Sequence, residues 1–201
     1  MTPITTETDM ARTDHKQTWR VNHDAVDTLT APAPAPPMGC ADRGDFVSAM
    51  AAAVNGVNVV TTDGTAGRFG ITVSAMSSVS ADPPMVLVCI NRRSPACAAV
   101  RANRAFSVNV LSTRQRHVAD TFAGRPARGE PYDFADALWT RGATGAPRLL
   151  DAISTFDCVL EKAYDAGSHT IFLGRVVAAN EGGGSPLLYT ARAYGYPCHW
   201  D

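Results

Sequence analysis

The 201-residue chain lacks the cysteine spacing of a disulfide framework or a zinc site. Its five cysteines stand at positions 40, 89, 97, 158 and 198, and none forms a C-x-x-C pair. An odd number at irregular spacing predicts neither kind of site. Cys89, Cys97 and Cys158 lie in apolar stretches, where a cysteine usually packs as a small hydrophobic side chain. We therefore expect no metal site.

The chain also has no excess of charge of one sign and no long apolar segment. The chain has 18 Lys and Arg against 19 Asp and Glu, for a net charge of −1. Such a chain has no overall positive field to hold nucleic acid or an anionic membrane. No apolar run approaches the roughly 18 residues of a membrane span, and the first residues lack the apolar region of a secretory signal. We expect a cytoplasmic protein with neither nucleic acid nor membrane as a partner.

The common nucleotide and nucleophile motifs are absent as well. The sequence contains no P-loop and no G-x-S-x-G elbow, so hydrolase and kinase functions have no support. The glycines from Gly64 to Gly70 are spaced G-x-x-G-x-x-G, and β-prone residues 71–74 follow them instead of a helix. We interpret this segment as a hairpin turn and not as a Rossmann dinucleotide loop.

Composition divides the chain into two parts. Residues 1–40 are polar and end in a Pro/Ala-rich run over 31–37, which favours extended geometry and cannot pack a core. We predict a flexible N-terminal tail over 1–40, the alternative being an arm that embraces a second subunit. Hydrophobic residues make up 45% of the chain, which is enough for one folded domain over 41–201.

The folded part has the pattern of a mainly β protein with a few short helices. Apolar residues at helical spacing predict a helix over 45–53, and two more short helices fall at about 95–103 and 114–122. Alternating or β-branched residues predict strands at 57–62, 68–79, 85–90, 105–111, 155–164, 170–178 and 187–194. The apolar run Met85–Ile90 predicts a strand that is buried on both faces. With so few helices between the strands, we expect an antiparallel β-barrel closed on itself.

The strand over 68–79 carries a first candidate binding surface. Its apolar side chains are Ile71, Val73 and Ala75, and they alternate with Thr72, Ser74 and Met76. A run of small hydroxyl residues follows at 77–80. Small side chains with hydroxyl and backbone hydrogen-bonding groups suit a wall for a flat heteroaromatic ring. A solvent-facing strand explains the same pattern equally well.

The segment Asn91-Arg92-Arg93-Ser94-Pro95 is a second candidate. Ser94 suits the N-cap and Pro95 the first position of a helix. A helix N-terminus preceded by two arginines can hold a phosphate, although an ordinary capped helix with solvated arginines has the same sequence. A third candidate is His169, at the start of an apolar strand, where it could position a nicotinamide or a flavin ring, or serve a structural role.

Taken together, these segments resemble the short-chain flavin reductases with the FMN-binding split-barrel fold. Within that group the chain is similar to the reductase components of two-component aromatic monooxygenases and to the flavin reductase of pyrimidine utilisation. The stretches that carry the resemblance are FVSAMAAAVNGVNVVTTDGTAGRFGITVSAMSSVSADPPMVLVCINRRS, FSVNVLS, HVADTFAG, TGAPRLLDAISTFDC, GSHTIFLGRV and PLLYTARAY. They run from Phe46 to Tyr194, about three quarters of the chain.

The resemblance implies a set of site residues. His169 would lie where the nicotinamide stacks on the flavin ring. Many members have Gly-Asp-His here, whereas this chain has Gly167-Ser168-His169. The residues implied to bind the flavin are Thr72, Val73, Ser74, Ala75, Ser78, Val79, Ser80, Asn91, Arg92, Ser94, Phe106, Asn109 and Tyr194.

The resemblance also implies an activity and partners. We expect an NAD(P)H:flavin oxidoreductase that transfers hydride from NADH or NADPH to FMN or FAD and supplies the reduced flavin to a monooxygenase. The expected assembly is a homodimer with a Greek-key-like split barrel in each subunit and the flavin near the interface. The alternatives are a split-barrel flavoprotein that keeps its FMN, acting as an oxidase or a ferric or cobalamin reductase, and a non-catalytic flavin-binding protein.

Overall fold

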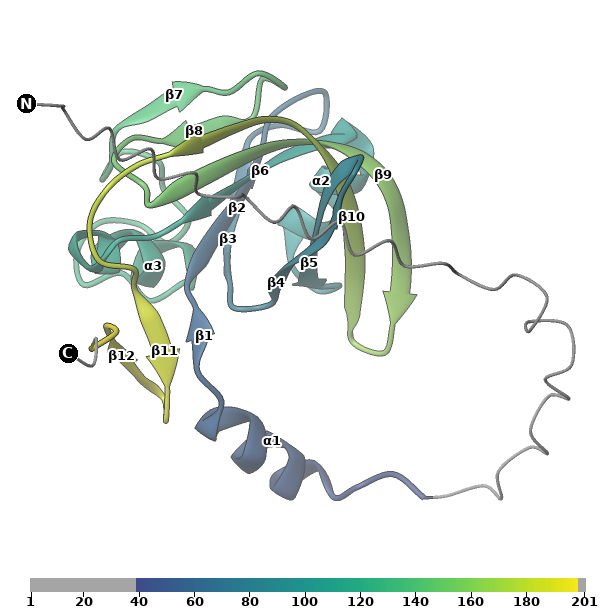
Figure 1. The fold of residues 1–201 in the computed structure, drawn as a ribbon, viewed down its shortest axis with the longest axis vertical. Coiled ribbons are helices and arrows are strands. Elements are labelled where there is room, and N and C mark those ends of the chain that lie inside the picture. The colour runs from purple at the N-terminus through teal and green to yellow at the C-terminus, as the bar shows by residue number, and fades with distance from the viewer. Residues whose placement is uncertain (1–38, 199–201) are drawn as a thin grey trace, which may run out of the picture. The chain divides into compact units, whose positions relative to one another are not determined.

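A computed structural model describes residues 39–198. The chain from Asp42 onward forms a compact unit, and the architecture below is that of this unit (Figure 1). The flexible tail predicted over 1–40 lies almost entirely outside the described residues, so it stays a prediction. No helix in residues 39–198 is both long and apolar enough to cross a membrane.

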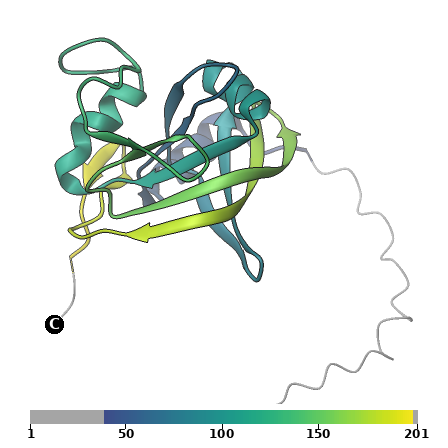
Figure 2. The same cartoon turned by 90° about the horizontal axis from the view of Figure 1, so that it is seen from above.

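A seven-stranded antiparallel sheet forms the body of the unit, with the strand order β3-β2-β6-β9-β10-β5-β4. Its strands are β2 (Asn58–Thr62), β3 (Phe69–Val73), β4 (Met76–Ala81), β5 (Pro84–Asn91), β6 (Ala105–Val110), β9 (Ser154–Ala166) and β10 (His169–Glu181). The long strands β9 and β10 curve across the molecule (Figure 2). The predicted mainly β fold is confirmed.

The sheet curls so that its two edges come together, because the edge strands β3 and β4 are consecutive in the chain. Only Ser74 and Ala75 link them, and the Cys89 backbone N–H donates to the Ala75 carbonyl over 3.1 Å. Residues 73 and 76 can be at most about 11 Å apart. No strand ladder joins β3 to β4 or β5 among the described residues, so the barrel is split here. The single strand predicted over 68–79 was therefore wrong: the chain changes sheet edge at Ser74.

One face of the sheet encloses the main core. Val60, Val88, Phe106 and Phe172 are among its buried side chains, and a second cluster lies under α3. The prediction that Met85–Ile90 is buried on both faces was wrong for the single chain. Alternate residues point into the core, but the side chains on the opposite face, at 85, 87 and 89, are only partly covered.

The three predicted helices are present, within about two residues of the expected ends. They are α1 (Arg43–Ala52), α2 (Pro95–Asn103) and α3 (Arg116–Phe122), the last preceded by a 3₁₀ turn, η2 (Thr113–Gln115). Asp42 caps α1 by accepting hydrogen bonds from the Gly44 and Asp45 amides, as an N-cap acid should. However, α1 buries none of its side chains, and Phe46 and Met50 are exposed.

Two small sheets complete the unit. One contains β1 (Asn55–Gly56), β11 (Leu188–Thr190) and β12 (Ala193–Gly195), and the other contains β7 (Trp139–Arg141) and β8 (Pro147–Leu149). The single strand predicted over 187–194 was wrong. Ala191 and Arg192 adopt φ values of 48° and 62°, and this left-handed turn divides the segment into β11 and β12.

Candidate flavin site

Three segments that the sequence proposed separately meet at the C-terminal end of β5. The β3–β4 link reaches this end through the hydrogen bond between the Cys89 amide and the Ala75 carbonyl. Asn91 lies two residues further along β5, about 7 Å away in an extended strand. Asn91 is the direct ladder partner of His169 on β10. The link, the segment before α2 and the start of β10 therefore share one region.

Only part of the predicted β3 wall is accessible. The Ser74 and Ala75 side chains are exposed, whereas the Val73 side chain is buried in the core. The Thr72 hydroxyl donates to the Ala119 carbonyl of α3 over 2.7 Å, so this residue faces the helix. In the single chain, Ser74 and Ala75 are the residues of this segment whose side chains a ligand can reach.

The start of α2 offers side-chain donors more than free backbone donors. Ser94 is the N-cap and accepts a hydrogen bond from the Ala96 amide over 3.3 Å, and the Cys97 amide donates to the Ser94 carbonyl. Pro95 has no N–H. Two of the first-turn amides are thus already paired, and the predicted phosphate contacts rest mainly on the Ser94 hydroxyl and on Arg92.

A positive cluster lies beside this helix start. Arg92 is 4.0 Å and Arg101 2.7 Å from the Asp165 carboxylate, so one acid is shared between two guanidinium groups. The Thr170 hydroxyl also donates to Asp165, and this hydrogen bond, with a smaller effect from the two arginines, lowers the pKa of the carboxyl group. Arg93 forms no ion pair within residues 39–198. The remaining positive charge is of the sign that a flavin phosphate requires.

His169 is held at the edge of this region by its neighbours. Its Nδ1 lies 2.9 Å from the Ser168 hydroxyl oxygen, and its side chain is exposed. The Arg92 amide donates to the Ser168 carbonyl over 3.0 Å, and the Arg92 side chain reaches the Gly167 carbonyl. The hairpin between β9 and β10 is thereby fixed to the turn before α2. Nε2 is left available for a ligand.

Ser78, Val79 and Ser80 lie toward the other end of the β4–β5 hairpin. Ser78 pairs with Val86, and a bulge at Val79 shifts the register before Ser80. Val86 is five residues from Asn91, or about 17 Å along the strand. Ser78 and Val79 are exposed. Ser78, Val79 and Ser80 can therefore contact a ligand bound at Asn91 only if the ligand is long. In a dimer they could instead contact a ligand bound to the second chain.

Phe106, Asn109 and Tyr194 are not grouped with the exposed residues. Phe106 and Asn109 are 0% exposed. The Tyr194 hydroxyl donates to Asp120 over 2.8 Å, and burial, followed by this hydrogen bond, raises the pKa of Tyr194 to about 12. The assignment of these three residues to the cofactor stays a prediction.

Sequence reasoning missed Arg101, Asp165 and Thr170, which surround Arg92 in a cavity of about 440 Å³. They come from α2, β9 and β10, and no local motif connects them. Two larger cavities, of about 660 and 860 Å³, are lined by none of the predicted site residues. The site that the single chain builds at the end of β5 is therefore open rather than enclosed.

Comparisons with known proteins agree with this picture. The family profile "Flavin reductase like domain" matches residues 50–197. The FMN reductase (NADH) RutF of Bradyrhizobium diazoefficiens is 45% identical over 151 residues, which cover 75% of this chain and 83% of that protein.

Solved structures share the fold. BorF, the flavin reductase component of a bacterial two-component tryptophan halogenase, superposes with a TM-score of 0.69 at 34% identity, covering 77% of this chain and 98% of BorF. The styrene monooxygenase flavin reductase of Pseudomonas putida S12 gives a TM-score of 0.67 at 28% identity, covering 77% of this chain and 97% of that protein.

Proposed function

Because the chain belongs to the flavin reductase-like domain family, we propose that it transfers hydride from NADH to a flavin and supplies the reduced flavin to a partner monooxygenase. The observation that carries the proposal is the meeting of Ser74 and Ala75, the turn before α2, and His169 at one end of β5. A flavin needs both a wall for its ring and a cation for its phosphate, and this region supplies them together.

The residues present fit a flavin by their chemistry. Arg92 and the Ser94 hydroxyl would hold the phosphate, and the arginine excess around Asp165 suits its charge. Ser74 and Ala75 would approach the ring closely because their side chains are small. When bound, the flavin accepts a hydride from the nicotinamide. The protein's part is to orient the two rings and to place hydrogen-bond donors where negative charge develops.

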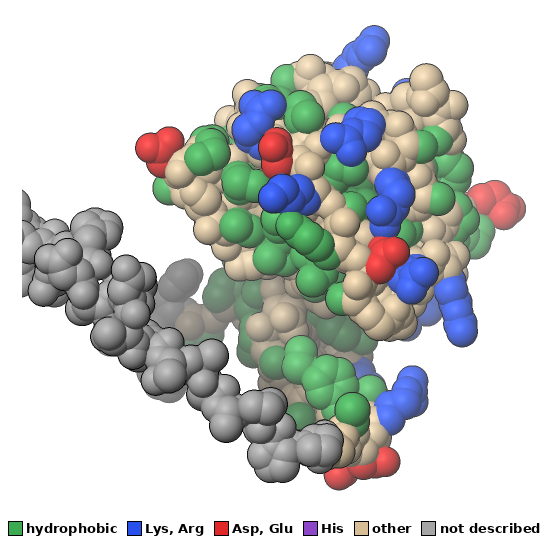
Figure 3. All heavy atoms as spheres, turned by 90° about the vertical axis from the view of Figure 1, so that its right-hand side faces the viewer, with side chains coloured by type: hydrophobic (Ala, Val, Ile, Leu, Met, Phe, Trp, Pro, Cys, Tyr) green, Lys and Arg blue, Asp and Glu red, His purple; other side chains and the backbone are tan. Residues whose placement is uncertain are grey.

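We include a homodimer in the proposal because the exposed site and the sheet beside it are only partly covered. On the face of β5 opposite the core, Leu87 and Cys89 are ladder partners of Leu173 and Ile171, and all four are half-buried. On the face in Figure 3, apolar side chains are open to solvent between Lys and Arg side chains. A second copy would bury apolar surface of this kind and enclose the flavin. Sedimentation equilibrium at micromolar concentration should give twice the chain mass.

The central experiment is Ser74→Trp. The Ser74 side chain is exposed, so an indole there should leave the core intact while filling the wall expected to face the flavin ring. We expect a normal circular dichroism spectrum and at least a hundredfold loss of NADH oxidation with added FMN. Ser185→Trp, at another exposed serine, is the matched control. Full activity of Ser74→Trp would show that the flavin binds elsewhere.

His169→Ala tests the proposed nicotinamide contact. Hydride transfer requires no general base at this position, so the residue should act on binding. We expect a severalfold higher KM for NADH, a similar kcat, and unchanged FMN affinity by fluorescence quenching. An unchanged KM for NADH would remove His169 from the site.

The proposal also covers which flavin is reduced and where in the cell the protein acts. Both FMN and FAD are proposed as substrates, because the similar proteins include an FMN reductase and an NADH:FAD oxidoreductase. Cytoplasmic location belongs to the proposal too. It suits a supply of NADH and the thiols of Cys89, Cys97 and Cys158, none of which forms a disulfide.

A further inference from the structure

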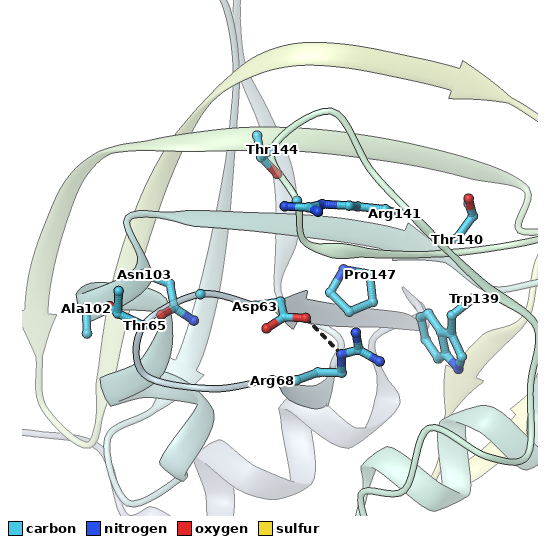
Figure 4. A pocket seen from close by; sticks show the side chains of 12 residues that line it. Asp63, Thr65, Arg68, Ala102, Asn103, Trp139, Thr140, Arg141, Thr144 and Pro147 are labelled. Carbon is cyan, nitrogen blue, oxygen red and sulfur yellow. Dashed lines mark hydrogen bonds and ion pairs between the residues drawn. The ribbon is translucent and has the colours of Figure 1, made fainter.

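A cavity of about 660 Å³ adjoins the cavity around Arg92 at Ala102, which lines both (Figure 4). Its walls are the loop over 63–68, the last residues of α2 and the β7–β8 hairpin. The loop over 63–68 joins β2 to β3 where Thr62 pairs with Phe69. Ser74 follows the opposite end of β3, where Val73 pairs with Asn58. The cavity is thus at the end of this strand pair opposite to Ser74, although it shares Ala102 with the cavity around Arg92.

The loop wall of the cavity is fixed by Asn103. Its side-chain amide donates to the Thr62 hydroxyl and to the Gly67 carbonyl, each over 3.0 Å, and its oxygen accepts from the Ala66 amide over 2.8 Å. A Cβ on Gly64 would lie 2.7 Å from the same oxygen, so this loop packs directly on α2. Because Asn103 already uses these groups, it acts as a support and leaves ligand contacts to other residues.

The hairpin wall is fixed from beneath by a buried acid. Asp157, only 1% exposed, accepts a hydrogen bond from the Ala143 amide over 2.9 Å. Gly142 packs directly against the Asp157 carboxylate, and the Gly145 amide donates to the Gly142 carbonyl over 3.0 Å. These contacts hold the backbone of the turn over 142–145 against the central sheet.

The charges in the cavity do not balance. Arg68 is paired with Asp63 over 2.9 Å, and this ion pair is drawn in Figure 4. The Arg141 side chain forms no ion pair or hydrogen bond with the residues that the structure describes. Its guanidinium packs over Gly145, where a Cβ would lie 3.3 Å from Nη2. Arg141 is thus without an ion pair in the cavity lining, while the buried Asp157 carboxylate lies beneath the turn that follows it.

A buried hydroxyl adds a second unused donor. The Oγ1 atom of Thr144, a residue of the cavity lining, is buried and has no hydrogen-bond partner among residues 39–198. In Figure 4, Arg141 extends away from Trp139, toward the side of the cavity where Thr144 lies. An unpaired buried hydroxyl is unfavourable, and a ligand oxygen that accepts from it would satisfy it. A guanidinium and a hydroxyl are both hydrogen-bond donors, so together they favour binding of a ligand with several acceptor oxygens.

The cavity also has an apolar part, formed by Trp139 and Pro147. Trp139 is held by edge-to-face packing on Phe122 and Phe134, with ring centroids 5.6 and 5.1 Å apart. Pro147 lies between Trp139 and Arg141 in Figure 4. We propose that this cavity binds a small organic anion, a carboxylate or phosphate monoester on a flat apolar body, with Arg141 holding the anionic oxygens and Thr144 donating to one of them.

Binding is tested on the full chain by isothermal titration calorimetry with benzoate, phenyl phosphate and inorganic phosphate. Benzoate and phenyl phosphate separate the two head groups, and inorganic phosphate lacks the flat body. We expect saturable binding of at least one aromatic anion, at least tenfold tighter than inorganic phosphate. Equal or tighter binding of inorganic phosphate would overturn the role of the apolar wall.

Matched variants locate the binding. Arg141→Gln should weaken the aromatic anion at least tenfold, and Thr144→Val should weaken it severalfold. Arg148→Gln is the control, because Arg148 faces Thr140 on the paired strand but does not line this cavity. The proposal would be overturned if Arg141→Gln left the affinity unchanged. It would also be overturned if no probe bound at millimolar concentration and in tenfold excess over the protein.

The reductase assay separates this cavity from the flavin site. Arg141→Gln should keep NADH oxidation with FMN within about twofold of the unmodified chain, because Arg141 lies outside the proposed flavin site. A large loss of that activity with normal folding would assign the cavity to flavin or NADH instead. Loss of activity in Ser74→Trp with anion binding retained would support two independent sites.

Discussion

Replacing Asn109 distinguishes a structural role for this residue from the cofactor role that family resemblance gives it. Asn109 is fully buried on β6. Its amide donates to the Val59 carbonyl over 3.0 Å and lies 3.4 Å from the Thr61 hydroxyl, and its oxygen accepts from the Leu149 amide over 2.7 Å. The side chain therefore ties β8 to the central sheet.

Asn109→Leu keeps the approximate volume but removes every one of these hydrogen bonds. The Leu149 amide would be left buried and unpaired, at a cost of about 1–3 kcal/mol, and the bond to the Val59 carbonyl contributes about 1 kcal/mol more. We expect the free energy of unfolding to fall by about 2–4 kcal/mol. For a chain of this size, that corresponds to a drop in Tm on the order of 10 °C.

The measurement is urea unfolding followed by circular dichroism, at one fixed protein concentration because an oligomer's stability depends on it. The matched control is Asn180→Leu. Asn180 is exposed and donates one hydrogen bond, over 3.3 Å, to the Thr155 hydroxyl, so its loss should cost less than about 1 kcal/mol. FMN affinity of folded Asn109→Leu should be unchanged. Normal stability with weakened FMN binding would refute the structural assignment.

Two further predictions concern pH. The pKa of Tyr194 is raised to about 12 by burial and by its hydrogen bond to Asp120, so the stability it contributes is present below its ordinary pKa of about 10 and is lost as the pH rises toward 12. The stability difference between the unmodified chain and Tyr194→Phe, measured by urea unfolding, should therefore shrink over that range; a constant difference would contradict it. The pKa of Asp165 is lowered chiefly by the Thr170 hydroxyl, so its contribution is present above the ordinary pKa of 3.8 and is lost as the pH falls through the lowered value. Thr170→Val should raise the pKa of Asp165 in a carboxyl-carbon NMR titration, and an unmoved titration curve would argue against that hydrogen bond.

The elements that the sequence predicted well are those whose signals are local. Ser94 and Pro95 mark the start of α2, and the β-branched run at 58–62 forms β2 as expected. The break at Ser74 could not be foreseen, because the alternation of apolar and polar residues continues through it. What ends β3 is a change of partner strand, from β2 to β5, and partner choice is a long-range property.

The hairpin β7–β8 was missed for a related reason. Its strands are three residues each and carry little periodicity. Three polar side chains of the central sheet hold it in place: Thr61 donates to the Pro147 carbonyl, Asn109 accepts from Leu149, and Asp157 accepts from Ala143. Buried polar residues on a strand are weak signals by themselves, since their partners come from distant parts of the sequence.

The geometry of the candidate site follows from the packing of the core. On the inner face of β5 and β10, Val88 opposes Phe172, and Val86 opposes Gly174, where a Cβ would lie 2.7 Å from that of Cys158. This packing fixes the register of the two strands. A slip of one residue would turn these side chains outward and part His169 from Asn91. The sequence could propose the phosphate turn and the histidine separately, but only the core, through strand register, brings them together.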